Sequence, residues 1–317
     1  MIAPVTPGVR DLNQVFGGRL KTGEPLARYT SARIGGPADY LAVAESAAEL
    51  ADLLQTAWQA GETPLVLGGG SNVLVSDLGV CGLVIVNRAR GVAFRDGPEA
   101  GDRPTVRAES GVSFGQLARQ CAARGLGGLA WAGTVPGTLG GAVVGNAGAH
   151  GGDLAGNLVL AEILQQEAGA RAWPAAELEF GYRTSRLKRQ RGAGRQWVVL
   201  SAELALSRAK PEAVQAQIDE FVSHRKRTQP PGASIGSMFK NPPGDYAGRL
   251  IEAAGLKGAR RGQAEISPLH ANFFVNHGEA RAADVLALLQ LAQRRVLQES
   301  GITLELEVEL VGEWPNE

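Results

Sequence analysis

The chain has 317 residues, a length typical of about two domains, and its 44% apolar and 20% charged residues exclude wholesale disorder. Its 32 basic and 32 acidic residues cancel, so no net charge attracts nucleic acid or an anionic membrane. Cys81 and Cys121 are too few for a disulfide framework or a zinc site, and residues 1–7 carry no export signal. We therefore expect a cytoplasmic protein with no metal, no nucleic-acid or membrane partner, and no obligate protein partner.

The first two thirds of the chain alternate strands with a few helices. The clearest helix is residues 46–61, where Ser46 and Glu49 form a capping box before an apolar stripe and Gly61 ends the pattern. A second helix follows Ser113 and places Cys121 on its apolar side. Runs of apolar and β-branched residues predict strands at 39–43, 64–67, 72–75, 83–87 and 105–109.

The last third is richer in helices, and we expect a domain boundary near residue 210. Helices are predicted over 211–227, 246–254 and 280–300, the last with an apolar stripe at Val285, Leu288, Leu289, Ala292 and Val296. Residues 302–310 alternate with period two, which predicts a half-buried strand. Glu305, Glu307 and Glu309 share one face of it; either all three face water or one faces a cleft, and the period does not choose between them.

Glycine, at 43 residues, is about twice as frequent as in an average protein, and two segments concentrate it. The first is the loop Gly68, Gly69, Gly70, Ser71 and Asn72. It is either a plain turn or a concavity whose backbone amides hold a phosphate. A strand follows it at once, so it is not the helix-opening dinucleotide fingerprint, and the chain has no ATPase-type phosphate loop.

The second glycine-rich segment is residues 125–152, which hold 11 glycines in 28 residues and no Asp, Glu, Lys or Arg. Pro136 and the glycines exclude a membrane-spanning helix, so we expect a loop system. Its candidates for cofactor binding are Gly133, Thr134, Pro136, Gly137, Thr138, Gly140, Gly141 and Asn146. Glycines that merely pack strands are the alternative. Two such loops, about 65 residues apart, favour one extended dinucleotide such as FAD, although spacing alone does not name it.

Two further patterns bear on function. The basic residues between Arg183 and Arg195 have no acid among them, and they favour an anionic small substrate over nucleic acid because aromatic residues do not interleave. Residues 232–236 match the G-x-S-x-G pattern of serine hydrolases around Ser234. The strand before and the helix after, which a nucleophile elbow needs, are missing, so the hydrolase hypothesis is weak.

Read together, six ordered motifs resemble the UDP-N-acetylenolpyruvoylglucosamine reductase family of peptidoglycan synthesis. They comprise Thr30–Gly36, Leu67–Asp77, Val135–Ala142 with Asn146–Ala149, Phe180–Ser185, Gly236–Pro242 and Leu304–Val308. The resemblance implies an α+β fold with a two-subdomain FAD-binding domain of the vanillyl-alcohol-oxidase/p-cresol-methylhydroxylase type at 1–210, its subdomains at about 1–78 and 79–210. It further implies a C-terminal α+β substrate-binding domain at 211–300, and a final strand, 301–317, that returns to the FAD domain.

The resemblance also implies the reaction. NADPH reduces FAD, and hydride then passes to UDP-N-acetylglucosamine enolpyruvate to give UDP-N-acetylmuramate. By motif position, Ser237 is the proton donor, and Arg183 and Glu307 stabilise the charge that develops on the substrate carboxylate. Substrate contacts are expected at Tyr182, Lys240, Asn241, His270 and Asn272. The alternatives are an FAD enzyme of the same fold with another small substrate, and a nucleotide-binding module without catalysis.

The chain departs from the family pattern near the expected flavin. His150 stands where members commonly have Tyr, and Gly145 where they often have Met or Gln. His150 apart, the glycine-rich loops hold no His or Cys suited to covalent flavin attachment, which favours noncovalent FAD. The tyrosine loop of the first subtype is missing between Ser185 and Gly236, so the chain resembles the shorter second subtype.

Overall fold

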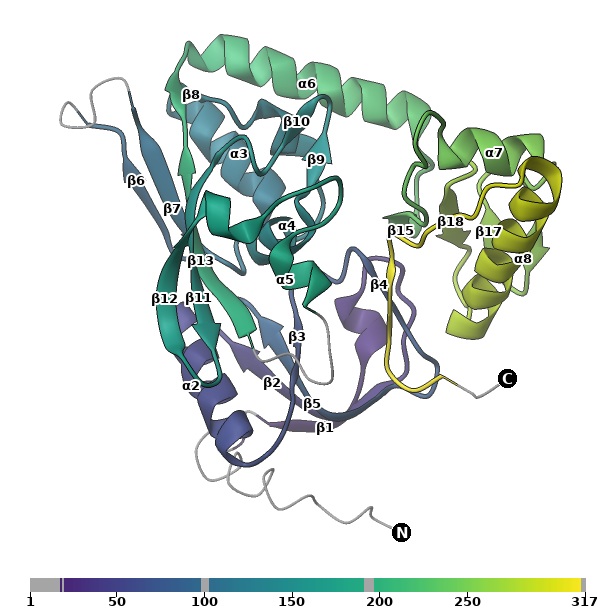
Figure 1. The fold of residues 1–317 in the computed structure, drawn as a ribbon, viewed down its shortest axis with the longest axis horizontal. Helices are drawn as coiled ribbons and strands as arrows, with labels where there is room; N and C mark the ends of the chain where they lie inside the picture. Colours follow the sequence, from purple (N-terminus) through teal and green to yellow (C-terminus); the bar gives the residue numbers. More distant parts are fainter. Residues whose placement is uncertain (1–17, 19, 98–102, 191–196, 315–317) are drawn as a thin grey trace. The chain divides into compact units, whose positions relative to one another are not determined.

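The computed structural model of the protein describes residues 18, 20–97, 103–190 and 197–314 (Figure 1). Residues 1–7, Arg191 and Arg195, on which sequence-based expectations fall, lie outside these ranges. The described residues form two compact units. The first comprises those before Thr22, residues 40–69 and residues 82–223, and the second comprises residues 22–39, 70–81 and those from His224 onward. No helix in the described ranges is long and apolar enough to cross a membrane.

The first unit is built on a five-stranded antiparallel sheet in the order β12-β11-β13-β7-β6. These strands are β6 (Val92–Arg95), β7 (Thr105–Glu109), β11 (Leu158–Gln165), β12 (Gly169–Pro174) and β13 (Trp197–Ala205). The helices beside them are α2 (Ala47–Gln59), α3 (Phe114–Ala123), α4 (Leu139–Gly145), α5 (Arg186–Arg189) and α6 (Pro211–Thr228).

Both faces of this sheet are covered. Ile163 and Val199 join the core formed with α3 and α4, whereas their chain neighbours Leu164 and Val198 pack with the buried stripe of α2. Successive residues of a strand point to opposite faces, so α2 lies on one face and α3 and α4 on the other. The core also contains Cys121, which is fully buried as predicted; burial raises the pKa of its thiol to about 12.

The predicted helix at 46–61 is confirmed as α2, and the predicted cap by Ser46 is present. The Ser46 hydroxyl accepts a hydrogen bond from the Glu49 amide at 3.1 Å. The Glu49 carboxylate reaches back to the amide of Glu45 at 2.8 Å, one residue earlier than a standard capping box. Gly61 ends the helix with a φ of +78°. The bond to Ser46 satisfies the Glu49 amide, which the first turn of the helix leaves without a helical partner.

A second sheet has the order β1-β2-β5-β3, in which β3 and β5 run parallel. Its strands are β1 (Lys21–Pro25), β2 (Pro37–Ala44), β3 (Leu65–Leu67) and β5 (Val80–Asn87), with a 3₁₀ turn, η2 (Leu26–Tyr29), after β1. The strands predicted at 39–43, 64–67 and 83–87 are therefore confirmed.

The expectation of a continuous loop system over 125–152 is partly wrong. The segment contains η4 (Ala130–Thr134), α4 and the two-residue strands β8 (Leu126–Gly127), β9 (Gly148–Ala149) and β10 (Gly152–Asp153). Helix α4 forms because Leu139, Ala142 and Val143 give it one buried face. Gly140 permits that packing, since a Cβ there would lie 2.9 Å from the Ser110 Cβ. Here the glycines allow close packing of a helix rather than an open loop.

The second unit contains a four-stranded antiparallel sheet in the order β15-β18-β17-β16. Its strands are β15 (Ala233–Ser237), β16 (Arg260–Arg261), β17 (Ala264–Ile266) and β18 (Phe273–Asn276), and its helices are α7 (Ala247–Ala253) and α8 (Ala282–Ser300). The predicted apolar stripe of α8, residues 285 to 296, is buried in the core of this unit. The predicted helices at 211–227, 246–254 and 280–300 are all confirmed.

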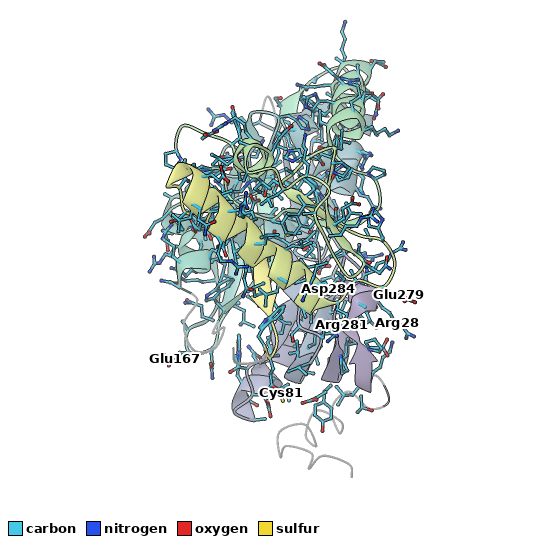
Figure 2. The ribbon with its side chains drawn as sticks, turned by 90° about the vertical axis from the view of Figure 1, so that its right-hand side faces the viewer. Arg28, Cys81, Glu167, Glu279, Arg281 and Asp284 are labelled. Atoms are coloured by element: carbon cyan, nitrogen blue, oxygen red, sulfur yellow. The ribbon has the colours of Figure 1, made fainter. Side chains whose placement is uncertain are left out.

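The N-terminus of α8 is capped by one side chain from a distant segment of the second unit, Asp77, and by one from its own first turn, Asp284. Both carboxylate oxygens of Asp77 accept hydrogen bonds from α8, from the Ala282 amide at 2.8 Å and the Ala283 amide at 2.9 Å. Asp284 accepts from the amide of Arg281 at 3.1 Å, and Figure 2 shows these two residues at that end of the helix. Carboxylates at this end also interact favourably with the helix dipole.

The continuous strand predicted at 302–310 is wrong, and its pattern of burial is right only in part, since Leu310 is 39% exposed. Leu304 and Val308 are buried and Glu305 is exposed. The backbone, however, changes partner along the way. Leu306 forms an isolated antiparallel bridge with Phe239, and only β19 (Glu309–Val311) is a ladder, parallel to β4 (Val73–Val75). Period two reports an extended backbone, not the partner to which it pairs.

The domain limits predicted at 210 and 300 stay predictions, because a compact unit need not coincide with a binding domain. Two facts bear on them. Val214 and Ile218 of α6 pack on Ala122 and Ala130 within the first unit, and the last strand, β19, pairs with a strand from residues 73–75.

Candidate functional site

In the first unit, the two glycine-rich loops predicted to bind a cofactor meet each other. A Cβ on Gly68 would lie 2.5 Å from the Thr138 Oγ1, and a Cβ on Gly69 would lie 2.9 Å from the Gly137 Cα. Gly137 has a φ of +92°, and its carbonyl accepts a hydrogen bond from the Phe114 amide at 3.1 Å, which fixes the loop to the start of α3. Close approach of two backbones is what the missing side chains permit.

The surface around this contact is open and lined by residues with little or no side chain. Gly69, Pro136 and Gly141 are exposed. A Cβ at Gly145 would meet no atom within 4 Å, and one at Gly141 only the Thr138 Oγ1 at 3.8 Å. Among the described residues, none accepts a hydrogen bond from the Gly69 amide. Open backbone and free donors of this kind fit the flat ring and the diphosphate of FAD.

Two of the predicted cofactor residues, Gly133 and Thr134, make contacts within the first unit. Gly133 is required by packing, since a Cβ there would lie 2.9 Å from the Ile218 Cγ2. Thr134 places its hydroxyl 3.1 Å from the Nε2 of His150. The His150 ring stacks on Phe221 with centroids 4.1 Å apart. These contacts describe how the loop is held, and a direct contact with the cofactor stays a prediction.

Asn146 holds the loop after α4 in place. Its φ of +45° is in the left-handed region, and its side chain is 4% exposed. The amide nitrogen donates to the Gly181 carbonyl at 3.0 Å and to the Asp153 carboxylate at 3.3 Å, while the amide oxygen accepts from the Ala155 amide at 3.0 Å. The side chain is thus occupied by the protein's own backbone and Asp153, and its predicted role toward the cofactor is not tested by this geometry.

Tyr182 and Arg183 form the tip of a tight turn in the first unit. Gly181 and Thr184 close the turn with two backbone hydrogen bonds, of 3.0 and 3.2 Å. Arg183 adopts a φ of +55°, a region that glycine favours and an arginine occupies at a cost. The Tyr182 ring is 58% exposed, and the Arg183 guanidinium carbon lies 5.7 Å from its centroid.

This turn is tied to the glycine-rich segment. The Ser185 hydroxyl donates to the Val144 carbonyl in α4 at 2.6 Å, and Asn146 holds the Gly181 carbonyl. The structure therefore brings the predicted catalytic Arg183 and the predicted cofactor segment together in one unit. Strained backbone that the surroundings enforce is typical of functional sites.

In the second unit, the loop Gly70–Asn72 lies beside the segment that carries Glu307. Gly70 has a φ of +57°, and a Cβ there would collide with the Tyr29 carbonyl oxygen. The Asn72 side-chain amide donates to the Glu307 carbonyl at 3.0 Å, and the Asn72 carbonyl accepts from the Glu309 amide at 3.0 Å. Ser71, between them, is half-buried.

The same unit brings Ser237 and Glu307 onto neighbouring segments. Ser237 ends β15 and follows Gly236, whose φ of +92° coincides with a register shift in the pairing of β15 with β18. Such a bulge re-aims the side chain that follows it. The next residue, Met238, accepts a hydrogen bond from the Glu307 amide at 2.9 Å. Ser237 and Glu307 are both half-buried.

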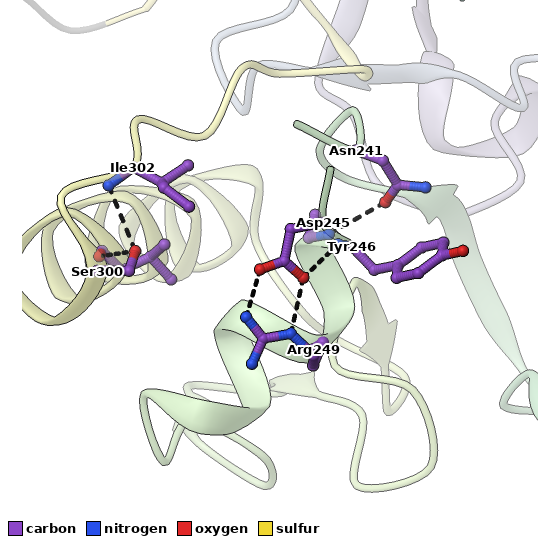
Figure 3. Close-up of polar contacts among 8 residues, drawn as sticks. Asn241, Asp245, Tyr246, Arg249, Ser300 and Ile302 are labelled. Atoms are coloured by element: carbon purple, nitrogen blue, oxygen red, sulfur yellow. Dashed lines mark hydrogen bonds and ion pairs between the residues drawn. The ribbon is translucent and has the colours of Figure 1, made fainter. Parts of the chain in front are cut away.

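Lys240 and Asn241, predicted substrate contacts, lie just beyond this point. The Lys240 ammonium pairs with the Glu305 carboxylate, and its amide donates to the Glu305 carbonyl at 2.9 Å. The Asn241 side-chain oxygen accepts from the Ala247 amide at 3.0 Å at the start of α7 (Figure 3). Of the three strand glutamates, Glu305 is therefore a surface partner of Lys240.

Close to Asn241, Asp245 and Arg249 pair through both carboxylate oxygens (Figure 3). Hydrogen bonding to Arg249, with a smaller contribution from the Tyr246 amide, lowers the pKa of Asp245 to about 2. The Tyr246 ring points away from this pair and is 69% exposed. The pair is solvent-exposed and serves to order the first turn of α7.

His270 is half-buried and Asn272 is buried, and both lie just before β18, the strand that pairs with β15. Burial lowers the pKa of His270, and its Nδ1 accepts a hydrogen bond from the Asn272 amide at 3.3 Å, which requires a neutral ring. The Asn272 side chain is bonded at both ends to the backbone of Phe239. The structure thus brings Ser237, Glu307, Lys240 and Asn272 together, and Arg183 belongs to the first unit.

Sequence reasoning missed Arg33. It is exposed and has a φ of +56°, in a turn whose Thr30 hydroxyl donates to the Ile34 carbonyl at 2.8 Å. The Ser31 amide bonds to the Gly70 carbonyl at 3.0 Å, so the turn is attached to the first glycine-rich loop. No sequence pattern indicates that an arginine adopts the left-handed backbone conformation.

Within the described ranges, no cluster of three or more His, Cys, Asp or Glu could hold a metal.

The fold and the glycine-lined surface define an FAD-binding protein. A model of the FAD binding domain matches residues 38–165, and a model of the UDP-N-acetylenolpyruvoylglucosamine reductase C-terminal domain matches residues 228–311. Two relatives named UDP-N-acetylenolpyruvoylglucosamine reductase share extensive identity with the chain. The protein from Chloroflexus aggregans is 45% identical over 92% of this chain and 97% of its own. The protein from Rubrobacter xylanophilus is 46% identical over 92% and 95%.

A solved structure agrees with the sequence relatives. The UDP-N-acetylenolpyruvylglucosamine reductase from Thermus caldophilus is 36% identical, with a TM-score of 0.74 over 93% of this chain and 98% of its own. This chain belongs to the UDP-N-acetylenolpyruvoylglucosamine reductase family. The predictions of that family, of an α+β fold with an FAD-binding domain, and of an FAD-dependent oxidoreductase are confirmed.

Proposed function

We propose that this protein reduces UDP-N-acetylglucosamine enolpyruvate to UDP-N-acetylmuramate with NADPH, through noncovalently bound FAD. The reaction is a cytoplasmic step of peptidoglycan precursor synthesis. It consumes one NADPH and one proton, and it places a hydride on C3 and a proton on C2 of the enolpyruvyl group. The observation that carries the proposal is the pairing of neighbouring segments that hold Ser237 and Glu307, within a member of this family.

FAD, when bound, supplies the two-electron transfer from NADPH to the substrate. The glycine-lined surface of Gly68, Gly69, Gly137 and Gly141 would hold it, because backbone is exposed there without side chains. Gly70, Ser71 and Asn72 continue the first glycine-rich loop and would contribute amides toward the diphosphate.

Ser237 gives its hydroxyl proton to C2 of the substrate. Hydride at C3 leaves negative charge that spreads from C2 onto the substrate carboxylate, and this carbanion is basic enough to take a proton from a serine. A positioned donor of this kind contributes about 10²- to 10⁴-fold in rate. The proton that Ser237 loses is replaced from solvent before the next turnover.

Arg183 and Glu307 stabilise the charge that develops on the substrate carboxylate. A fixed guanidinium lowers the energy of that charge most in a site that excludes water. Glu307 acts together with Arg183 at the same carboxylate. Tyr182, Lys240 and Asn241 contact the anionic UDP-sugar, for which Lys240 offers a charge at the edge of the site.

The test separates the two halves of the reaction in a Ser237→Ala variant. We expect NADPH to bleach its flavin at the wild-type rate, and the enolpyruvyl substrate to reoxidise it about 10²- to 10⁴-fold more slowly. Ser234→Ala is the matched control, since Ser234 is half-buried in the same strand three residues away. Equal reoxidation rates for Ser237→Ala and the wild-type protein would contradict the assignment of the proton donor.

A further inference from the structure

The hydroxyl of Ser237 depends on its backbone for its direction. No described residue forms a hydrogen bond with this hydroxyl. The residue before it, Gly236, has a left-handed φ and lies at the register shift in the pairing of β15 with β18, so the ladder is interrupted just before Ser237. Beyond this interruption the backbone is held at Ser237 itself by its pairing with Phe273, and after it by whatever holds Met238 and Phe239.

Asn272 holds both of those residues. Its carbonyl accepts a hydrogen bond from the Met238 amide at 2.9 Å. Its side-chain oxygen accepts from the Phe239 amide at 2.9 Å, and its side-chain nitrogen donates to the Phe239 carbonyl at 2.8 Å. With these two bonds the side chain imitates a strand partner for Phe239, at a point where β18 has no residue opposite it.

The geometry leaves few substitutes for this side chain. Asn272 is 3% exposed. A polar group of its side chain that lost its hydrogen-bond partner on Phe239 would therefore stay buried without water as a replacement, which destabilises the fold. An aspartate keeps the acceptor for the Phe239 amide but faces the Phe239 carbonyl with a second acceptor. Only a planar amide of this length presents one donor and one acceptor side by side.

We infer that Asn272 is a positioning residue that aims the Ser237 hydroxyl, and that it acts through Ser237 rather than by contact with substrate. The inference rests on the proposed function. A displacement of about 1 Å in a reacting group can cost about 10²-fold in rate. The proton transfer to C2 should therefore depend on this amide, while the reaction of NADPH with the flavin should not.

The test is a double-mutant cycle on the reoxidation of reduced flavin by the enolpyruvyl substrate. We expect Asn272→Ala to slow reoxidation at least about 10-fold in the wild-type background. In the Ser237→Ala background the same change should slow it by less than about 2-fold, because two residues that act as a unit are not additive. Flavin reduction by NADPH should stay within about 2-fold of wild type in every variant.

Asn276→Ala is the matched control. Asn276 lies four residues along the same segment, is 8% exposed, and uses its side-chain amide for three hydrogen bonds, to Ala32, Gly278 and Ala280, where the Asn272 side chain forms two. Asn276→Ala should lower the melting temperature as much as Asn272→Ala does, and it should leave the rate of flavin reoxidation unchanged. If Asn272→Ala does not fold, Asn272→Asp keeps the size of the side chain and is read by the same cycle.

A second readout needs neither cofactor nor substrate. Hydrogen exchange of the Phe239 amide in the apoprotein should speed up at least about 10-fold in Asn272→Ala and not in Asn276→Ala. If Asn272→Ala slows reoxidation equally in the wild-type and Ser237→Ala backgrounds, or in neither, the inference about Asn272 is overturned and the proposed function is not. A wild-type flavin that the substrate does not reoxidise would overturn the proposed function, and the inference with it.

Discussion

Arg183 offers the sharpest separation of stability from catalysis, because its backbone is strained and its side chain is proposed to act. At a φ of +55° an L-residue costs about 1–2 kcal/mol relative to the right-handed region, a cost that glycine does not bear. Glycine loses about 0.5–1 kcal/mol more backbone entropy on folding than alanine does. Arg183→Gly should therefore be more stable than Arg183→Ala by up to about 1.5 kcal/mol.

Both substitutions remove the guanidinium, and both keep the carbonyl to which the Lys188 ammonium donates at 3.2 Å. Loss of one group that stabilises developing charge costs about 10²- to 10³-fold. We expect both variants to reoxidise their flavin that much more slowly with the substrate, at equal FAD content. Urea denaturation compares their stabilities. An alanine variant more stable than the glycine variant would refute the strain argument, and a glycine variant with near wild-type reoxidation would refute the role of the guanidinium.

Two further changes test the cofactor surface and the half-buried imidazole. Gly69→Ala should lower FAD affinity at least about 10-fold because its Cβ would push the Gly137 backbone away. Titration of apoprotein with FAD measures this affinity, and a wild-type affinity would contradict the contact of the two loops. Burial lowers the pKa of His270 below its usual 6.5. As the pH falls, the imidazole is therefore protonated in the unfolded chain before it is protonated in the folded protein, and the free energy of unfolding should fall below about pH 6.5. Melting temperatures from pH 8 to 5 should fall less for His270→Gln than for wild type, and parallel curves would contradict a neutral half-buried ring.

The sequence predicted most of what local pattern controls. The helix at Ala47–Gln59 begins at Ser46 and ends at Gly61 because capping and glycine chemistry act over a few residues. Period two predicted the burial of Leu304 and Val308, yet not the change of backbone partner, since the partners lie at Phe239 and at β4, far away in the chain.

The candidate site was predictable as a set of motifs but not as a set of contacts. The number of glycines favoured a cofactor surface. Only the structure shows that a side chain at Gly133 would collide with Ile218, and one at Gly69 with the Gly137 backbone. Asn272 is predicted to contact substrate, and only the structure shows that its side chain binds the backbone of Phe239. A hydrogen bond between residues 33 positions apart depends on the fold, and no spacing in the sequence encodes it.

The central claim is that one bound flavin takes electrons from NADPH and gives them to an enolpyruvyl UDP-sugar. The measurement that tests it most directly is the visible absorbance of the purified protein with FAD in anaerobic buffer. NADPH should bleach the flavin spectrum, and UDP-N-acetylglucosamine enolpyruvate should restore it. A flavin that NADPH bleaches and the substrate does not restore would contradict the proposed substrate, and a protein that takes up no FAD would contradict the account of the glycine-lined surface.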